Sequence, residues 1–400
     1  MKLNRCAWLG VAAMSLLCGC SGFWNATTSS SGGGSGTDAA SGVFYVLNEQ
    51  TTQVAAMQFA AKSNGPSALT GSPYTLGALP YTMAIAPSGN FLYVSTVSGI
   101  YVYSATSSGT LTIANGGSVI SADSAFAMQV DPTGTWLIEV VSGQGTVNAI
   151  PISASSGLFD VSRGEKTVAL SAVTITQLAI SPLNSTNAYV FVGMGVGGTA
   201  VVPFTAANTA SGTSPFGTAS TINVRNSAGA ANTVAVDPSN RVLYVGETVA
   251  FTNQTQSGGV RVFTIGANSA MTEVSGSPFA TGGTGPSSIL PLTTSGGTSL
   301  VYVANKAVSG SSTGNITGFS LSASGTSYTL TTINTVSAGT SPAWLAVDST
   351  GTYLLSVSSS GNPDLSTFTF DSTTTGKLNA SATSSTGTDP VQAVTVVAQP

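Results

Sequence analysis

Ionisable side chains are scarce in this chain, so the residues that could perform chemistry form a short list. Its 400 residues include 14 acidic and 10 basic side chains and no histidine. A Ser-His-Asp triad therefore cannot form, and a general base that works near neutral pH would have to be a carboxylate or a lysine with a shifted pKa. The possible chemistry is restricted to carboxylates and a few cations.

The charged candidates lie in loops that follow or precede apolar runs. Glu247 and Arg225 stand in consecutive loops of one sequence repeat, where a carboxylate–guanidinium pair would either orient a ligand or tie the loops together. Phe251 stands in an insertion, Thr248 to Gly259, whose amide and hydroxyl side chains suit a neutral polar ligand or a protein surface; a variable surface loop is the alternative. The charged candidates are Glu49, Asp123, Arg225, Glu247, Lys306, Asp364 and Asp389.

Metal and cofactor motifs are not evident in the sequence. Asp131, Asp237 and Asp348 recur at one position of a repeated turn, and we interpret them as local hydrogen-bond acceptors rather than as a ring of metal ligands. No DxDxDG-like run is present. The segment Gly193 to Gly198 looks like a dinucleotide fingerprint but opens no helix. We therefore expect neither a metal nor a cofactor.

The elements that must position these residues are short β-strands. Charged residues make up 6% of the chain, against about 25% in ordinary globular proteins, while glycine and β-branched residues are abundant. The stretch Thr233 to Gly246 is typical of a hairpin, because β-branched runs flank an Asp-Pro-Ser-Asn turn. Its copies recur roughly every 50 residues, a period typical of propellers. The copies are anchored at Pro87, Pro132, Pro182, Pro238, Thr294, Ser349 and Val396.

The two ends of the repeated region complete one another. Six copies have a second strand, whereas the seventh, Val391 to Val397, has none, and an orphan second strand stands at Val43 to Asn48. Pairing of these ends predicts an all-β, seven-bladed β-propeller closed within one blade. A β-sandwich and a β-solenoid are the alternatives. In a propeller, the loops that carry the charged candidates share the face at the mouth of the central channel.

The N-terminus is typical of a targeting segment. Lys2 and Arg5 precede an apolar run that is too short to span a bilayer, and a small residue comes directly before Cys20. This pattern resembles the lipobox of bacterial lipoproteins, which implies a signal peptide over residues 1–19, a lipid on Cys20 and a flexible tether over 20–42. An ordinary secretory signal is the alternative. No basic patch is present, so we expect no nucleic-acid partner.

Particular motifs of the repeats resemble a known family. The run PSGNFLYV, the asparagines Asn48 and Asn305 that close VFYVLN and LVYVAN, and the GSPY and GSPF segments resemble the lactonase-type seven-bladed propellers, also described through their YVTN repeats. The resemblance covers Val43 to Val397. It implies a propeller fold. The family includes 6-phosphogluconolactonases, cycloisomerases and exported proteins of no assigned activity.

Two functions from different classes follow from the sequence. We expect a lipid-anchored module at the cell envelope that binds an envelope protein or a glycan through its loop face. The alternative is a lactone or ester hydrolase with Glu247 or Asp123 as the carboxylate base in the central funnel; a purely structural envelope protein is a third possibility. Ser21 after the lipid-bearing cysteine favours the outer membrane if the source is Gram-negative. The binding candidates are Arg225, Glu247, Lys306, Phe251, Glu49 and Asp389.

Overall fold

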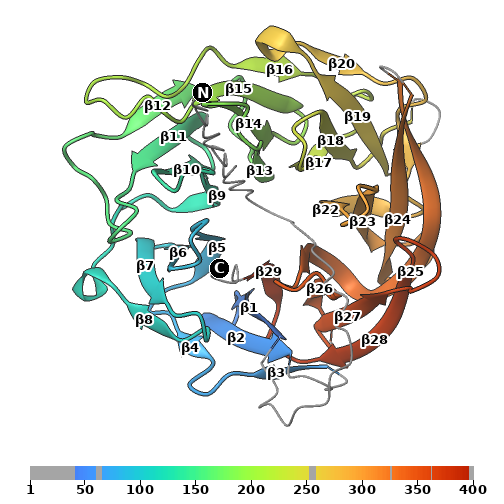
Figure 1. The fold of residues 1–400 in the computed structure, drawn as a ribbon, viewed down its shortest axis with the longest axis horizontal. Helices are drawn as coiled ribbons and strands as arrows, with labels where there is room; N and C mark the ends of the chain where they lie inside the picture. The colour runs from blue at the N-terminus through green and yellow to red at the C-terminus, as the bar shows by residue number, and fades with distance from the viewer. Residues whose placement is uncertain (1–40, 60–64, 252–257, 325–326, 362, 396–400) are drawn as a thin grey trace, which may run out of the picture.

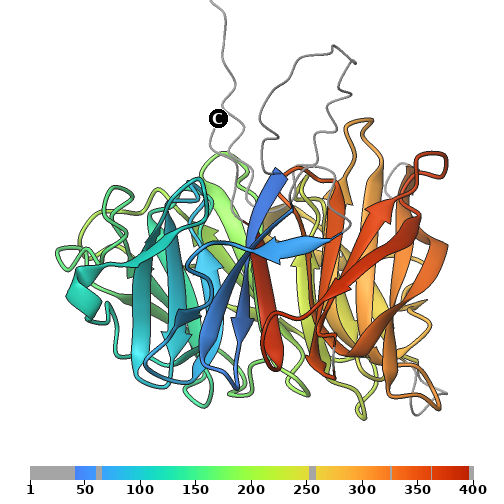
Figure 2. The same ribbon diagram turned by 90° about the horizontal axis from the view of Figure 1, so that it is seen from below.

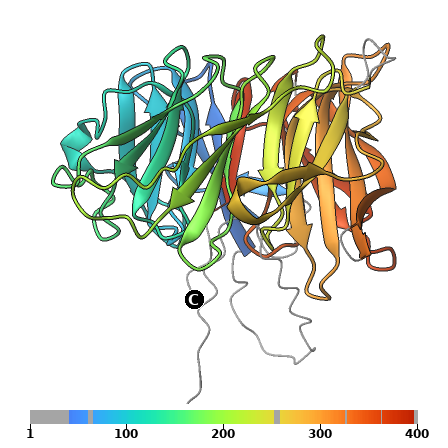
Figure 3. The same cartoon turned by 90° about the horizontal axis from the view of Figure 1, so that it is seen from above.

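Runs of β-branched and aromatic residues, separated by glycine-rich and Asx-rich turns, form a ring of antiparallel sheets (Figure 1). The computed structural model describes residues 41–59, 65–251, 258–324, 327–361 and 363–395. Figures 2 and 3 show the sheets edge-on, side by side in a thick disc. The strands run along the thickness of the disc, so each hairpin turn lies at one of its two faces.

Six sheets contain the described strands, and one strand near each end of the chain contributes to the same sheet. That sheet is β29 (Pro390–Thr395), β1 (Ser41–Asn48), β2 (Gln53–Phe59) and β3 (Pro66–Ala68), with β4 (Tyr74–Thr75) paired to β2. The next two are β5 (Pro80–Ile85), β6 (Phe91–Thr96), β7 (Gly99–Ala105), β8 (Leu111–Ile113), and β9 (Ala125–Val130), β10 (Trp136–Val141), β11 (Thr146–Pro151), β12 (Lys166–Ala169).

The remaining sheets follow in chain order. They are β13 (Gln177–Ile180), β14 (Asn187–Gly193), β15 (Thr199–Thr205), β16 (Ser220–Ile222); then β17 (Ala231–Val236), β18 (Val242–Glu247), β19 (Gly259–Ile265), β20 (Met271–Glu273), with β21 (Phe279–Ala280) paired to β19; and a seven-stranded sheet of β22 (Thr284–Thr293), β23 (Ser299–Ala307), β24 (Thr313–Ser324), β25 (Ser327–Val347), β26 (Tyr353–Ser360), β27 (Leu365–Phe370) and β28 (Leu378–Ser384). In the described part of the chain, helical structure is confined to two 3₁₀ turns, η1 (Asn115–Gly117) and η2 (Ala267–Ser269).

The repeated hairpin turns have the chemistry that the sequence indicates. Oδ1 of Asp237 accepts hydrogen bonds from the backbone N–H groups of Arg241 and Val242, at 2.7 and 2.6 Å. The carboxylates of Asp131 and Asp348 accept equivalent bonds within their own turns. Asn240 occupies the left-handed region at φ 55°. The recurring aspartates therefore stabilise local turns.

Two of these turns differ from the sequence prediction by one residue. The second residue after the repeat anchor in these two hairpins is Asn184 or Gly296, a type that reaches positive φ without strain, but the following residue, Ser185 or Gly297, takes the positive φ instead. In the second case the turn hydrogen bond runs from the N–H of Gly297 to the carbonyl of Thr294, the anchor residue itself, whereas in β17–β18 it ends on Asp237, one residue before the anchor. The loops of these two hairpins differ in length from that of β17–β18, because Ile180 pairs with Val190 and Leu292 with Leu300, against Val236 with Leu243.

The long strand β25 is another difference from the expectation of separate outer and inner strands. Its first part pairs with β24 as far as Thr340, and its last part pairs with β26 from Thr340 onward. Gly339 and Ser341, with φ of 80° and 51°, lie where the pairing changes partner. The connection between two four-stranded groups is thus reduced to a bend within one strand, which joins them into one sheet.

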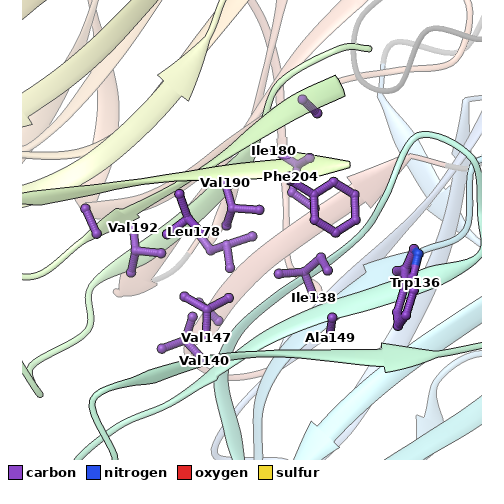
Figure 4. Close-up of a cluster of buried hydrophobic side chains, with 14 of the residues drawn as sticks. Trp136, Ile138, Val140, Val147, Ala149, Leu178, Ile180, Val190, Val192 and Phe204 are labelled. Atoms are coloured by element: carbon purple, nitrogen blue, oxygen red, sulfur yellow. The ribbon is translucent and has the colours of Figure 1, made fainter. Parts of the chain in front are cut away.

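Apolar side chains fill the space between neighbouring sheets. Figure 4 shows one cluster, in which Trp136 and Ile138 of β10 face Val190 of β14 and Phe204 of β15. Similar clusters lie between the other neighbouring pairs, and one lies inside the seven-stranded sheet, where Tyr302 of β23 packs with residues of β26 to β28. Packing between sheets, rather than a single central core, holds the ring together.

Three of the buried tyrosines on second strands add a polar link to their cluster, whereas the hydroxyl of Tyr244 on β18 is buried without a hydrogen-bond partner among the described residues. Tyr45 and Tyr93 are buried, and each hydroxyl donates to a glycine carbonyl of the next sheet, at 3.1 and 2.9 Å. The buried Tyr302 donates to the carbonyl of Gly376 at 2.7 Å, which links the two halves of the seven-stranded sheet. Trp136 uses its indole N–H in the same way, toward the carbonyl of Ala206. An aromatic residue with a polar tip therefore fastens neighbouring sheets at their outer turns.

Neighbouring sheets are also linked close to the axis. Gln177 of β13 accepts a bond from the N–H of Val234 in β17 at 2.9 Å, and Gln392 of β29 both accepts from and donates to the backbone of Met83 in β5. Asn232 donates to the carbonyl of Pro286 at 2.6 Å. The side-chain amides of these inner strands are therefore hydrogen-bonded to the backbone of the next strand group.

The predicted N-terminal features, namely the signal peptide, the lipid on Cys20 and most of the tether, lie outside the described residues. Within those that are described, no helix has the length and apolar character needed to cross a membrane.

Candidate functional site

A cavity of about 500 Å³ lies on the axis, among the starts of the inner strands. Strands β5, β9, β13, β17, β22, β25 and β29 all contribute to its wall. Its lining is mostly apolar and uncharged polar, which is the usual make-up of a small-molecule site. The polar and aromatic lining residues are Tyr81, Thr82, Phe126, Thr176, Gln177, Asn232, Ser287, Trp344, Ser359 and Gln392.

Two of the charged residues singled out from the sequence lie at this cavity. Glu49 follows β1 and Lys306 lies near the end of β23, and both line the cavity wall. Asp389 is close to Glu49, because the N–H of Glu49 donates to the carbonyl of Asp389 at 3.3 Å. The cavity therefore combines a carboxylate and an ammonium group with uncharged donors and acceptors.

Glu247 lies elsewhere, in a buried ion cluster within the sheet β17–β20. It is 1% exposed, and Oε1 accepts from Nη1 of Arg261 at 2.8 Å. Arg261 also holds Glu273 through Nε and Nη2, at 3.1 and 2.8 Å, and Phe263 lies under its guanidinium. Arg261 is buried, and its bonds to Glu247 and Glu273 join three neighbouring strands, β18, β19 and β20. The cluster therefore stabilises the sheet.

Arg225 joins this cluster in a different way from the pair that the sequence suggested. Its guanidinium donates to Oε1 of Glu273 at 3.1 Å, while its backbone N–H donates to the carboxylate of Glu247 at 3.2 and 3.3 Å. Burial raises the pKa of Glu247, and the bonds from Arg261 and Arg225 oppose that rise. Glu273 is less buried, and the bonds and charge of Arg261 lower its pKa.

Phe251 lies at the edge of the same region. Its carbonyl accepts a bond from Nδ2 of Asn226 at 3.1 Å, which ties the insertion to the loop before β17. Residues 252–257 of that insertion lie outside the described chain. Asp364 is buried, and Oδ1 accepts from the N–H of Thr386 at 2.9 Å. Both residues brace loops on the face that holds the cavity.

Asp123 belongs to a second group of carboxylates, between the sheets β5–β8 and β9–β12. Oxygens of Asp123, Glu139 and Glu165 lie within 4.8 Å of one another. Glu139 is fully buried on β10, and burial and the nearby Asp123 raise its pKa to about 9. The cavity on the axis is lined by neither Asp123 nor Glu247.

Sequence reasoning missed Arg261, Glu273 and Glu139, because it searched the loops alone. A usable signal was present in two of them. Arg261 interrupts the apolar run GVRVF and Glu139 interrupts WLIEVV, and a charged residue inside a predicted buried strand requires a partner. Gln177 and Gln392 gave no comparable signal, since an amide near a strand terminus is common.

No protein-family model matches the chain, and no curated protein matches its sequence. Solved structures do match its fold. A "putative 6-phosphogluconolactonase" from Bacteroides fragilis has a TM-score of 0.67 at 14% identity, over 91% of this chain and all of the other.

A second structure agrees with the first. The periplasmic gluconolactonase of Pseudomonas aeruginosa has a TM-score of 0.63 at 17% identity, over 89% of this chain and 99% of the other. A protein from Lactobacillus plantarum matches with a TM-score of 0.62 at 14% identity, over 89% of this chain and 99% of that one. At such identities the likeness concerns the fold. The chain therefore has the lactonase-like β-propeller fold that its repeat motifs resemble.

Proposed function

We propose that the cavity on the axis binds a neutral, polyhydroxylated ring and hydrolyses its lactone or a related ester. The observation that carries this proposal is the lining: a carboxylate, an ammonium group and uncharged polar and aromatic side chains around one space of about 500 Å³. The sequence favoured a binding module, whereas the lactonase names of the structural neighbours support the hydrolase alternative better.

The proposed reaction needs few residues. Glu49 acts as the general base and takes a proton from water as the water oxygen bonds to the lactone carbonyl carbon. Lys306 stabilises the negative charge that develops on the carbonyl oxygen. The ring C–O bond then breaks, and the departing alkoxide takes the proton back from Glu49, so the products are a hydroxy acid and an unchanged enzyme.

The lining also favours one substrate class over another. Phosphate recognition generally uses several arginines or lysines together. Lys306 is the cation among the described residues that line the cavity. Neutral sugar lactones are therefore the expected substrates, and phosphorylated ones are disfavoured. This choice moves the proposed base from Glu247 and Asp123 to Glu49, since only Glu49 of the three lines the cavity.

The test is a panel of neutral and phosphorylated sugar lactones, with acid release followed by pH-stat. The full chain should hydrolyse a neutral lactone, and Glu49→Gln should lower kcat by about 100-fold or more, the usual range for loss of a general base. Lys306→Met should lower kcat by about 10- to 100-fold. The matched controls are Asp371→Asn and Lys377→Met. They change an acidic and a basic residue in the turn before β28, and neither residue lines the cavity.

A second candidate is binding without turnover, which keeps the glycan-binding module of the sequence prediction. The aromatic rings of Tyr81, Phe126 and Trp344 line the cavity and offer faces on which a sugar ring can stack. In that case calorimetry would detect a glycan or lactone that the pH-stat shows to be unchanged. Substitution of Trp344 by alanine would then weaken binding, and Glu49→Gln would leave it within about twofold of the starting affinity.

The number of blades is a further proposal about the fold. We infer seven blades, closed by the pairing of β1 with β29. Support comes from seven inner strands around the cavity, and from a seven-stranded sheet whose halves change partner at Thr340. A circular permutant opened between β28 and β29 should fold, because its new ends lie in a loop. In this permutant a linker joins β29 to β1, so the two paired strands become one hairpin.

Export and lipid attachment also stay as proposals. The chain enters the ring at Ser41, and β1 then carries it to Glu49 at the cavity, so a lipid on Cys20 would hold the opposite face toward the membrane. The cavity would point outward, toward soluble substrates, glycans or envelope proteins. Metabolic labelling with a fatty acid should mark the chain and should fail to mark Cys20→Ala; labelling of that variant would overturn the anchor.

A further inference from the structure

Three carboxylates meet between the sheets β5–β8 and β9–β12, away from the residues proposed for hydrolysis. Asp123 comes from the loop before β9, Glu139 from the middle of β10 and Glu165 from the loop before β12. One oxygen of each lies within 4.8 Å of the other two. Three segments that are separate in sequence thus bring like charges to one point.

The buried member of this group occupies a position that other repeats fill with valine. Seven residues after the turn prolines of three repeats stand Val94, Glu139 and Val245. The two valines are 0% and 1% exposed, and Glu139 is 0% exposed. An apolar side chain is therefore compatible with this position of the fold, and packing alone does not account for a carboxylate there.

Protein cations do not balance this charge. In the described part of the chain, no recorded ion pair joins Asp123, Glu139 or Glu165 to a lysine or arginine. The nearest basic residue in sequence, Lys166, donates its Nζ to the carbonyl of Arg163 at 3.0 Å. The group consequently lacks the partner that a buried carboxylate requires.

Two buried oxygens at the group have no hydrogen-bond donor. Oε2 of Glu139 is one of them. Asn148, opposite Glu139 on β11, is 3% exposed and donates Nδ2 to Oε1 of Glu139 at 3.3 Å, while its own Oδ1 has no partner. Buried oxygens are normally paired with hydrogen-bond donors, and these two are not paired within the described part of the chain. Carboxylate and amide oxygens of this kind are the ligands that hard cations prefer.

We propose that Asp123, Glu139 and Glu165 bind a hard divalent cation, Ca²⁺. The amide of Asn148, whose Nδ2 faces Glu139 in this structure, adds its oxygen as a further ligand once the amide group turns over. Carboxylate and amide oxygens of irregular arrangement suit Ca²⁺ better than Mg²⁺, which demands near-ideal octahedral geometry, and they suit Zn²⁺ least because nitrogen and sulfur ligands are lacking. The ion ties the loop before β9 and the loop before β12 to the buried strand β10.

The competing occupant of the site is a proton. Burial and the charge of Asp123 raise the pKa of Glu139 to about 9, so a proton can neutralise Glu139 when no metal is bound. The two occupants make different predictions. A proton needs no added metal, whereas a calcium site makes stability and binding depend on the calcium concentration.

The experiment measures the thermal midpoint of the full chain in EDTA and in CaCl₂, together with equilibrium dialysis against CaCl₂. We expect one Ca²⁺ per chain and a midpoint about 3 °C or more higher at a hundredfold excess over Kd. Mg²⁺ at the same concentration should protect less. An unchanged midpoint with no stoichiometric binding would overturn the proposal and leave the proton as the occupant.

Variants locate the ion. Glu139→Gln removes the buried ligand, and because it could also impair folding, Asp123→Asn and Glu165→Gln remove ligands that are partly or fully accessible. Each should weaken Ca²⁺ binding by about 10-fold or more. Asp160→Asn, in the same connection between β11 and β12 but outside the group, should bind as the unmodified chain does. Full binding by the Asp123→Asn/Glu165→Gln double variant would refute this site.

Discussion

Glu247 and Glu139 are two buried carboxylates on second strands, and their surroundings could hardly differ more. Glu247 is held by the guanidinium of Arg261 at 2.8 Å, inside a cluster whose charges are paired. Glu139 faces Asp123 and Glu165. The first carboxylate has its counter-charge within the sequence, whereas the second requires one from solution or gives up its own charge.

Both residues replace an uncharged residue of the repeat, yet at positions with different roles. Three residues after the buried tyrosine of a second strand stand Asn48, Asn305 and Glu247, and the two asparagines each donate to a threonine carbonyl of the preceding loop. Glu247 braces that loop too, as an acceptor for Arg225. Glu139 stands where valines pack. At the bracing position the charge has a fixed partner in Arg261, whereas at the packing position Oε2 of Glu139 has none among the residues that the structure describes, which is why we propose a bound cation there.

The largest expected effect comes from removal of the fixed partner. Arg261→Met should lower the free energy of unfolding by about 3–5 kcal/mol, because it leaves the buried carboxylate of Glu247 unpaired. Denaturant unfolding monitored by tryptophan fluorescence measures the change. Arg241→Met is the control: its ion pair with Asp237 is solvent-exposed on the arginine side, and its loss should cost at most about 1 kcal/mol. If the two variants lose the same stability, the buried cluster has no special role.

The opposite sign is expected at the other carboxylate. Glu139→Val should raise the free energy of unfolding in EDTA by about 1–2 kcal/mol, since it replaces a buried ionisable group by the side chain that this position holds in other repeats. Calcium should no longer stabilise this variant. The measurement is a pair of denaturant titrations, in EDTA and in CaCl₂. A loss of stability in EDTA would show that Glu139 is structural in the absence of metal, as Glu247 is.

Most of the strand pairings could be predicted from the sequence, but one could not. The hairpins from β5–β6 to β25–β26 and the pairing of β1 with β29 could be predicted, because strand patterning and turn chemistry are local and repeat in phase. The Asx turns followed for the same reason. The long strand β25 could not, since its change of partner at Thr340 depends on how two groups of strands dock.

The candidate sites were harder to predict than the fold. Glu49 and Lys306 could be placed at the mouth from loop position alone, and they do line the cavity. The partners of Glu247 and Asp123 could not, because Arg261 reaches Glu247 diagonally from the neighbouring strand and Glu139 meets Asp123 through the way the loop before β9 folds over β10. Such contacts depend on register and on the direction of each side chain, which the repeat pattern leaves open.

The smallest effect should come from the exposed member of the arginine cluster. Arg225→Ala should change the free energy of unfolding by no more than about 0.5–1 kcal/mol, for two reasons. The Arg225 side chain is 39% exposed, so its bond to Glu273 is screened by solvent. Its link to Glu247 is made by the backbone N–H, which alanine retains.

The stability of this variant shows whether one arginine or two neutralise the charge of Glu247. If Arg225→Ala costs little while Arg261→Met costs several kcal/mol, the counter-charge of Glu247 resides in one buried guanidinium, and the loop adds only a main-chain hydrogen bond. If Arg225→Ala is as costly as Arg261→Met, the two arginines and two glutamates act as one coupled network. The double variant decides between them, because coupled residues give a cost that differs from the sum of the single costs.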